Sequence, residues 1–421
     1  MDIIIGAGAT GLSCASFLGK DYRILEAESE IGGYCKTIRK DGFVWDYSGH
    51  FFHFRNPAIG SYVKQYIPRQ ALLDCHKHTQ IKYKDRYIDY PFQKNIHQLN
   101  QPEFIDCLYD LFCNPYIEYE NFEEMLYCKF GKSIAQKFLI PYNEKLYACP
   151  LNRLDPDAMG RFFPYADKTD IIANFKKHDN QSYNDTFTYP LGGAIEYIHS
   201  LLQRVDSASI QTSCPVNRID PARKIVFTPK GNLTYDHLIS TIPFPILLDL
   251  CGMKYDPTVY SWNKVLVFNL GFDIKGPDAV NHWIYFPDKA LSFYRVGHYD
   301  NIFQTDRMSL YVELGFAKDA DIDVEKWFTR VLTDLQTAGV VNTQKLISSH
   351  HVIMDPAYVH ITQHSISDVQ RKKEELASLD IYSIGRYGSW TYYSIEDGII
   401  EALELCQALY GKTGAELVAN T

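Results

Sequence analysis

The stretch that decides the fold lies at residues 2–26. It reads Asp-Ile-Ile-Ile-Gly-Ala-Gly-Ala-Thr-Gly, then an apolar segment, then Tyr-Arg-Ile-Leu-Glu. This order predicts a strand, a glycine-rich turn, a helix and a second strand that ends in an acid. Gly6 allows the tight turn, Gly8 lets the backbone approach a pyrophosphate, and Gly11 lets the helix pack on the strand. Glu26 stands where a carboxylate accepts hydrogen bonds from a ribose hydroxyl. We therefore expect a dinucleotide-binding unit whose helix N-terminus faces the phosphates.

A second pair of glycines narrows the choice of dinucleotide. Gly32 and Gly33 follow soon after the acid and favour FAD over NAD. The expected contacts of FAD in this stretch are made by Gly6, Gly8, Gly11, Glu26 and Gly33. A glycine-rich turn of purely structural use is the alternative interpretation.

The composition excludes several classes of protein. With 421 residues, of which 46% are hydrophobic and 22% charged, the chain is long enough for two or three packed subdomains. The net charge of −9 argues against nucleic acids and anionic membranes as main partners. The ten cysteines include no CxxC pair, which indicates reduced thiols and a cytoplasmic location. No apolar run reaches the roughly 18–20 residues of a membrane span. We expect no signal peptide, because the first predicted strand begins at residue 2. A homo-oligomer stays open.

The order of expected elements predicts a discontinuous α/β fold. Apolar residues recur at helical spacing in the first half, strands follow, and a last strand and helix return to the nucleotide-binding unit. We expect a Rossmann-like FAD-binding domain with a helical insertion and an antiparallel β-sheet insertion. The expected boundaries are 1–75, 186–246 and 377–421 for the FAD-binding domain, 95–185 for a helical substrate-side domain, and 76–94 and 247–376 for a β-sheet substrate domain.

Tyrosine, arginine and amide side chains gather in several scattered segments. The chain has 31 tyrosines, and the richest segments begin at Tyr90, Pro141, Trp283, Asp355 and Gly385. Such side chains stack on a flat base and bind a diphosphate by charge-assisted hydrogen bonds. They supply no protein nucleophile, and the histidines lack the spacing of metal ligands. We therefore expect no metal and assign the difficult chemistry to the flavin.

Taken in order, these segments resemble the UDP-galactopyranose mutase family, and its eukaryotic-type branch more than the short bacterial one. The most specific are Tyr-Pro-Phe-Gln at 90–93, Pro-Tyr-Asn-x-Lys-x-aromatic-Ala-x-Pro at 141–150, and Gly-Arg-aromatic-Gly-x-Trp-x-Tyr at 385–392. The resemblance implies an isomerase that interconverts the pyranose and furanose forms of UDP-galactose without net redox change. It also implies reduced FAD as the active cofactor, a covalent flavin N5–sugar adduct, and NAD(P)H or another reductant as electron donor.

The resemblance assigns roles to individual residues. The implied catalytic residues are Gly49 and His50 in the loop beside the flavin ring, Arg161 near the sugar, and Arg295 at the diphosphate. The implied substrate-binding residues are Tyr90, Phe92, Gln93, Asn143, Tyr147, Asn184, Tyr285, Tyr358 and Tyr392. Val216 matches the chain beside the adenine, and Arg386 matches the segment over the flavin. After Tyr392 the chain departs from the family's polar pattern and reads Ser-Ile-Glu-Asp at residues 394–397.

Three other functions remain open from the sequence. An FAD-dependent oxidoreductase of the amine oxidase or protoporphyrinogen oxidase type shares the fingerprint, the Tyr-Pro-x-Gly-Gly turn at 189–193 and the Gly-Arg strand. A mutase for another nucleotide sugar would use the same kinds of side chain. A flavin-binding protein without catalysis is the third. A single tyrosine is more often a core or surface residue than a ligand, and His53 is expected to be structural.

Overall fold

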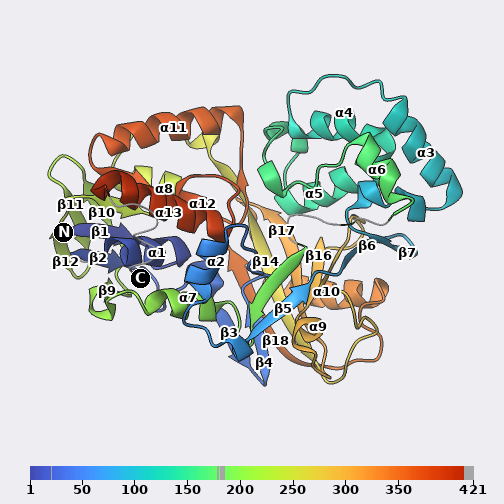
Figure 1. The fold of residues 1–421 in the computed structure, drawn as a ribbon, viewed down its shortest axis with the longest axis horizontal. Helices are drawn as coiled ribbons and strands as arrows, with labels where there is room; N and C mark the ends of the chain where they lie inside the picture. The colour runs from blue at the N-terminus through green and yellow to red at the C-terminus, as the bar shows by residue number, and fades with distance from the viewer. Residues whose placement is uncertain (20, 178–179, 181–184, 412–421) are drawn as a thin grey trace.

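The structure is a computed structural model that describes residues 1–19, 21–177, 180 and 185–411 (Figure 1). Its first unit is a five-stranded sheet in which neighbouring strands are parallel, in the order β20-β13-β1-β2-β9. The strands are β1 (Asp2–Ile5), β2 (Tyr22–Leu25), β9 (Ile210–Gln211), β13 (Leu238–Ser240) and β20 (Ile381–Ser383). The sheet is therefore assembled from the beginning, the middle and the end of the chain.

Helices cover this sheet because its central strands are apolar on both faces. Ile3, Ile4 and Ile24 have no exposed surface. Helix α1 (Ala9–Leu18) packs on α13 (Ile395–Tyr410) and on α7 (Ile195–Leu202). The other helices of this half of the molecule are α2 (Pro57–Lys64), α8 (Phe244–Leu250), α11 (Gln363–Ala377) and α12 (Gly385–Gly388) (Figure 1).

A second, larger sheet lies beside the first. Its strand order is β18-β14-β17-β16-β15-β6-β7, with β19 paired to β14. Most neighbours are antiparallel, but β6 and β15 run parallel. The strands are β6 (Thr79–Tyr83), β7 (Arg86–Asp89), β14 (Ser261–Phe272), β15 (Trp283–Tyr285), β16 (Arg295–His298), β17 (Ser309–Ala317), β18 (Leu346–Met354) and β19 (Val359–His360).

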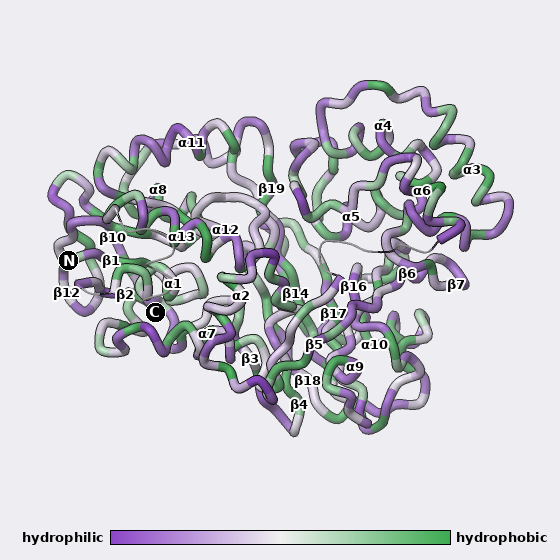
Figure 2. Tube along the Cα trace, viewed as in Figure 1, coloured by the Kyte–Doolittle hydropathy of each residue, from purple (hydrophilic) through white to green (hydrophobic). Residues whose placement is uncertain are grey.

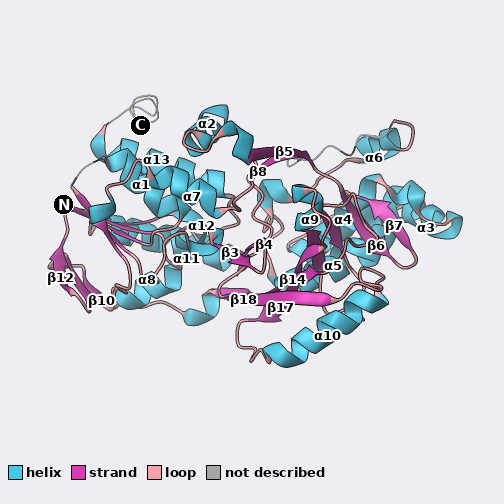
Figure 3. Cartoon of the chain, turned by 90° about the horizontal axis from the view of Figure 1, so that it is seen from below, coloured by secondary structure: helices cyan, strands magenta, loops and turns pink. Residues whose placement is uncertain are grey.

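Helix α10 (Val324–Thr337) runs along β17 and β18 on this sheet (Figure 3). The contact is apolar, since Phe268, Leu335 and Val331 are fully buried in one cluster. Helix α9 (Tyr299–Phe303) follows β16 directly. The smaller pairings are β3 (Thr37–Lys40) with β4 (Phe43–Asp46), β5 (Leu72–His76) with β8 (Thr186–Pro190), and the antiparallel set β10 (Arg218–Asp220), β11 (Ile225–Thr228) and β12 (Gly231–Thr234).

A group of helices forms the far end of the molecule in Figure 1. It contains α3 (Gln101–Phe112), α4 (Phe122–Ile134), α5 (Ile140–Tyr147) and α6 (Lys168–Asn174). Asn100 and Asn121 cap α3 and α4, because each side-chain oxygen accepts a backbone N–H three residues later. These helices confirm the predicted helical insertion. Cysteine and leucine side chains on the inner side of α3 are buried, whereas Tyr109 on its outer side is 66% exposed.

The hydropathy of an element decides how clearly the sequence pattern predicts it. Strands β1 and β14 consist largely of hydrophobic residues, whereas α11 is largely hydrophilic (Figure 2). Helix α11 packs against β20 of the parallel sheet, although residues 247–376 were expected to form the β-sheet domain. Among the described residues, no helix combines the length and apolar character needed to cross a membrane.

Candidate active site

One cavity of about 810 Å³ lies where the parallel sheet, the large sheet and the helical group meet. Most of the residues singled out in the sequence line it. They are Gly6, Gly8, Glu26, Gly33, Gly49, His50, Tyr90, Asn143, Arg161, Val216, Tyr285, Arg295, Tyr358, Arg386 and Tyr392. The cavity therefore brings the dinucleotide fingerprint and the polar aromatic segments to one place.

The glycine-rich turn has the geometry of a phosphate cradle. Gly6 has a φ of +102°, a conformation that favours glycine. A Cβ at Gly11 would lie 2.0 Å from the carbonyl oxygen of Gly6, so Gly11 serves helix packing and does not line the cavity. A Cβ at Gly8 would meet no atom within 4 Å, which leaves the backbone open to the cavity at the start of α1. The turn thus fits the pyrophosphate of a dinucleotide.

The acid at the end of β2 is held in place by backbone donors. Glu26 accepts the N–H of Ala7 at 2.8 Å and the N–H of Glu28 at 2.9 Å, one on each carboxylate oxygen. Its side chain is buried but still lines the cavity. Val216 lies on the same cavity wall with Pro215 and Leu250, an apolar surface that suits an adenine. These residues fit FAD.

Arg295 is fixed by a carboxylate on the neighbouring strand. Its Nε and Nη2 donate to the two oxygens of Glu313 at 2.6 and 2.8 Å. The two residues are paired across β16 and β17, and Glu313 has no exposed surface. The oxygen that accepts Nη2 also accepts the hydroxyl of Ser48. A planar guanidinium held in this way is oriented for anion recognition at the cavity.

The loop that contains Gly49 and His50 is packed on both sides. A Cβ at Gly49 would lie 2.4 Å from the hydroxyl oxygen of Tyr311. Nδ1 of His50 lies 3.1 Å from the carbonyl oxygen of Ser48, and a carbonyl only accepts, so Nδ1 carries the proton. Burial lowers the pKa of His50 to about 4. His50 is therefore neutral at pH 7, and its Nε2 is a hydrogen-bond acceptor.

Arg161 is bound to the N-terminus of α13. Its Nη2 donates to both carboxylate oxygens of Asp397 at 2.6 and 2.7 Å, and to the hydroxyl of Ser394 at 3.2 Å. Ser394 and Asp397 also form the capping box of α13. The segment at 394–397, where the sequence departs from the family's polar pattern, thus supplies the partner of a predicted catalytic arginine.

Arg386 lies among aromatic rings. Its guanidinium carbon is 4.6 Å from the ring centre of Tyr392 and 5.3 Å from that of Tyr358. These two tyrosines stack with their ring centres 5.7 Å apart. Nη1 of Arg386 donates to the carbonyl oxygen of Tyr393 at 2.8 Å. The segment over the cavity is therefore rigid and carries a positive charge.

Three predicted substrate residues do not line the cavity, and a fourth cannot be placed. Phe92 is fully buried and stacks at 5.3 Å on Phe138, which lines the cavity, so Phe92 lies one layer behind. Tyr147 lies in the same way behind Tyr358, with ring centres 5.9 Å apart. Gln93 is buried and donates its amide to the carbonyl oxygen of Pro164. Asn184 lies outside the described residues.

Two amide oxygens on this side of the cavity lack a partner. Within the described ranges, the side-chain oxygens of Gln93 and Asn143 are buried without a hydrogen bond. The amide nitrogen of Asn143 donates to the carbonyl oxygen of Leu139 at 2.6 Å, which fixes the side chain. A buried acceptor without a donor costs free energy. A ligand with an N–H donor would satisfy such an atom.

The structure adds residues that the sequence reasoning missed. Tyr142 lines the cavity with its ring centre 5.0 Å from that of Tyr285. His53 also lines the cavity, with Nδ1 2.7 Å from the carbonyl oxygen of Thr186. Glu396 is 3% exposed and accepts the backbone N–H of Asn56 at 2.7 Å. Tyr142 could have been found from its place in the motif at 141–150, but Glu396 had no local signal.

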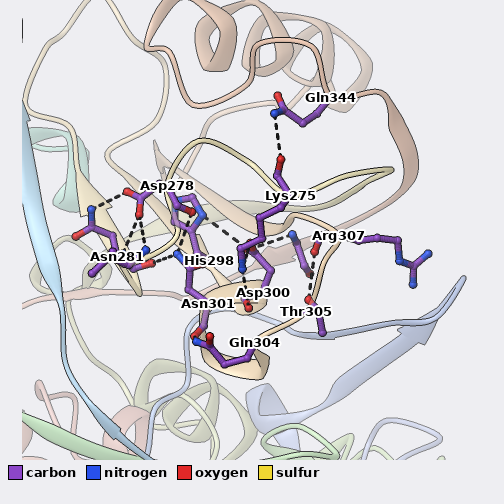
Figure 4. Close-up of polar contacts among 12 residues, drawn as sticks. Lys275, Asp278, Asn281, His298, Asp300, Asn301, Gln304, Thr305, Arg307 and Gln344 are labelled. Carbon is purple, nitrogen blue, oxygen red and sulfur yellow. Dashed lines mark hydrogen bonds and ion pairs between the residues drawn. The ribbon is translucent and has the colours of Figure 1, made fainter.

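Strand β16 leads from Arg295 to a buried polar network (Figure 4). Asp300 has no exposed surface and pairs with the Lys275 ammonium at 3.0 Å. Nδ1 of His298 lies 3.8 Å from the carboxylate of Asp300, and burial lowers the pKa of His298. Asn301 donates to the carbonyl oxygen of Asn281 at 2.7 Å. This network fixes the end of the strand that presents Arg295.

Among the described residues, no group of three or more His, Cys, Asp or Glu is placed to hold a metal.

Two known proteins of similar sequence each match part of the chain. A UDP-galactopyranose mutase from Mycoplasma pneumoniae is 24% identical over 239 residues, 52% of this chain and 55% of that protein. The chain thus spans about half the length of this curated relative. A zeta-carotene-forming phytoene desaturase from Myxococcus xanthus is 29% identical over 93 residues, 20% of this chain and 17% of that protein.

Two solved structures of similar fold cover nearly the whole chain. A crystal structure of reduced UDP-galactopyranose mutase has a TM-score of 0.91 and 24% identity, covering 100% of this chain and 97% of that one. A putative protoporphyrinogen oxidase from Exiguobacterium sp. 255-15 has a TM-score of 0.78 and 17% identity, covering 97% of this chain and 98% of that one. These likenesses confirm the fold class: a Rossmann-like α/β domain with helical and sheet insertions. Residues 9–352 match the family described as flavin containing amine oxidoreductase. The chain therefore belongs to the flavin-containing amine oxidoreductase family.

Proposed function

We propose that this protein is a flavin-dependent mutase that interconverts the pyranose and furanose forms of a nucleotide sugar, UDP-galactose first among them. We further propose that it resembles the eukaryotic-type branch of UDP-galactopyranose mutases. The observation that carries the proposal is the single cavity in which a dinucleotide cradle meets Arg295, Tyr285, Tyr358 and Tyr392. A flavin site alone does not require this second polar group.

The cofactor would be FAD, held at its pyrophosphate by the Gly6–Gly8 turn and at its ribose by Glu26. Val216 would lie against the adenine, and Arg386 would lie over the isoalloxazine. When bound in its reduced form, FAD supplies the nucleophile for the anomeric carbon of the sugar. We propose NAD(P)H or another reductant as the electron donor.

The protein's own part is to bind and retain the nucleoside diphosphate. Arg295 is the main positive charge, because Glu313 fixes the plane of its guanidinium beside the cavity. Tyr285, Tyr358 and Tyr392 line the same cavity, and we propose that their hydroxyl groups donate to the diphosphate. A diphosphate held by such donors leaves as a stabilised anion and stays in place to recombine with the sugar.

The side of the cavity that contains Asn143 would take the base. The unpartnered oxygen of Asn143 accepts a hydrogen bond from an imide N–H, such as that of uracil. The unpartnered oxygen of Gln93 is a second buried acceptor of the same kind. Tyr90 and Tyr142 each pack against Tyr285 and give this end of the cavity flat apolar walls.

His50 and Arg161 would act on the sugar side. Neutral His50 offers Nε2 as an acceptor, which suits a proton shared with the cofactor or with a sugar hydroxyl. Asp397 orients the Arg161 guanidinium, and we propose that Arg161 binds sugar hydroxyls. The side chains that would select the sugar lie in this part of the cavity, so the sugar is identified by assaying different nucleotide sugars.

The test is direct interconversion by the FAD-loaded, dithionite-reduced protein. UDP-galactopyranose should equilibrate with UDP-galactofuranose, separated by anion-exchange chromatography, while the oxidised protein should be inactive. The matched control is Arg307→Ala, which removes a surface arginine bound to the carbonyl oxygens of Asp41 and Gly42. Interconversion absent from the reduced protein but present with a dTDP- or GDP-linked sugar would assign another nucleotide sugar.

The second candidate is a flavin oxidoreductase of the amine oxidase or protoporphyrinogen oxidase type. The family match and the likeness to a putative protoporphyrinogen oxidase support it. Such an enzyme would consume oxygen with an amine or porphyrinogen and would not bind UDP. Oxygen uptake with such substrates, together with no UDP binding, would replace the mutase proposal. A cytoplasmic location and a homo-oligomer remain proposals to be checked by fractionation and light scattering.

A further inference from the structure

The Glu313 carboxylate connects two parts of the site that are distant in sequence. One of its oxygens accepts Nε of Arg295 at 2.6 Å. The other accepts Nη2 of Arg295 at 2.8 Å and the hydroxyl of Ser48. Glu313 has no exposed surface, so these bonds are shielded from water and are stronger than their equivalents at the surface.

Ser48 carries the connection into the loop that contains His50. Its carbonyl oxygen accepts Nδ1 of His50 at 3.1 Å and the hydroxyl of Tyr299 at 3.3 Å. One serine therefore binds Glu313 through its side chain and His50 through its backbone. The series arginine, glutamate, serine, histidine runs without a gap from the proposed diphosphate ligand to the proposed flavin loop.

The surroundings leave this loop little freedom to move independently. Tyr311, two residues before Glu313 on β17, packs against both Gly49 and Gly297. A Cβ at Gly297 would lie 1.9 Å from the Tyr311 ring, and one at Gly49 would lie 2.4 Å from its hydroxyl oxygen. A shift of β17 or of Glu313 would thus be transmitted to Gly49 and His50.

We propose that Glu313 and Ser48 are positioning residues that couple anion binding at Arg295 to the His50 loop. The inference rests on the proposed function, which makes Arg295 the ligand of the diphosphate. An anion at Arg295 competes with Glu313 for the guanidinium, and a carboxylate that loses donors there binds Ser48 more strongly. Coupling between two sites is reciprocal, so we expect a change of flavin oxidation state that acts on the His50 loop to change the affinity for the diphosphate.

The test measures UDP binding to the FAD-loaded full chain in both oxidation states. Kd is determined by anaerobic calorimetry for the oxidised and the dithionite-reduced protein. The two values should differ about fivefold or more in the wild type, the usual range for coupled sites. Ser48→Ala should bring them within about twofold of each other while flavin content and Tm stay near the wild-type values. Ser48→Thr, which keeps the hydroxyl, should restore the difference.

A matched control removes a similar hydrogen bond elsewhere. Ser133 donates its hydroxyl to the Asp110 carboxylate at 2.6 Å in the helical group, so Ser133→Ala should keep the wild-type ratio. If Ser48→Ala does not fold, Glu313→Gln keeps the shape of the side chain and should also reduce the ratio.

The outcomes separate the two proposals. A wild-type protein that does not bind UDP overturns the mutase proposal and the coupling with it. UDP binding that Arg295→Ala weakens, with a wild-type ratio in Ser48→Ala, leaves the diphosphate role intact and overturns the coupling alone.

Discussion

Replacing Arg295 by alanine should damage the protein in two separable ways. The substitution leaves the Glu313 carboxylate, which has no exposed surface, without its counter-ion. Removing one partner of a buried ion pair costs about 3–5 kcal/mol of unfolding free energy. The substitution also removes the proposed diphosphate ligand. Loss of a charge-assisted bond to a desolvated phosphate weakens UDP binding by about 2–4 kcal/mol, roughly 30- to 700-fold.

A second substitution separates the two effects. Adding Glu313→Gln to Arg295→Ala removes the unpaired charge, so the unfolding free energy should return to within about 2 kcal/mol of the wild type. UDP affinity should stay low, because the guanidinium is still missing. Urea denaturation, calorimetry with UDP and flavin absorbance measure the three quantities, with Arg307→Ala as the surface control. Wild-type UDP affinity in Arg295→Ala would refute the diphosphate role. A double variant as unstable as the single one would refute the account based on the unpaired charge.

Three other predictions concern the flavin, its oxidation state and two buried histidines. The purified protein should contain one FAD per chain, and Gly11→Val should abolish flavin absorbance because a Cβ there would lie 2.0 Å from the Gly6 carbonyl oxygen; tight NAD binding without flavin would overturn the assignment. Turnover should require reduced FAD although the reaction is redox-neutral, so full activity of the oxidised protein would exclude the mechanism. Burial lowers the pKa of His50 and of His282 from 6.5 to about 4, so the contribution of these two histidines to stability should be complete above pH 6.5 and decline between pH 6.5 and about 4, because the unfolded chain takes up protons first. His282→Gln should make that decline shallower in urea titrations at fixed pH, and an unchanged slope would contradict this account.

The strand, glycine-rich turn and helix at the start of the chain could be predicted because their determinants lie close together in the sequence. Gly6, Gly8 and Gly11 act through backbone conformation and close packing within one strand, turn and helix, and Gly33 has a φ of +55° as a turn glycine should. The position of Glu26 could be predicted because it directly follows the second strand. Each of these residues belongs to the first 33 positions of the chain, so a single stretch of sequence contains the pattern.

The partners of the charged residues could not be predicted in this way. Glu313 lies inside a strand of alternating residues and pairs with Arg295 only because β16 and β17 are in register. Asp397 meets Arg161 across 236 residues of chain. Such pairs depend on how distant elements pack, and nothing in the local sequence marks them.

The same reason explains the residues that matched a motif but lie behind the cavity wall. Phe92 and Tyr147 are next to lining residues, yet Phe138 and Tyr358 stand between them and the cavity. A motif identifies a segment of the site. Whether one of its side chains reaches the cavity depends on which other ring packs between that side chain and the cavity. Helix α11 was not predicted because its sequence is hydrophilic and has few apolar residues at helical spacing.

The parallel sheet has a consequence for biosynthesis. Strand β13 is hydrogen-bonded to β1 on one side and to β20 on the other. A nascent chain that has left the ribosome only as far as residue 380 therefore presents β13 as an open edge, with unpaired backbone groups. Helix α13, which packs on the phosphate-binding helix α1, emerges later still. We therefore expect capture of the flavin to be a late event in synthesis, and a chain that is cut short by a few dozen residues to lose the cofactor along with the edge of its first sheet.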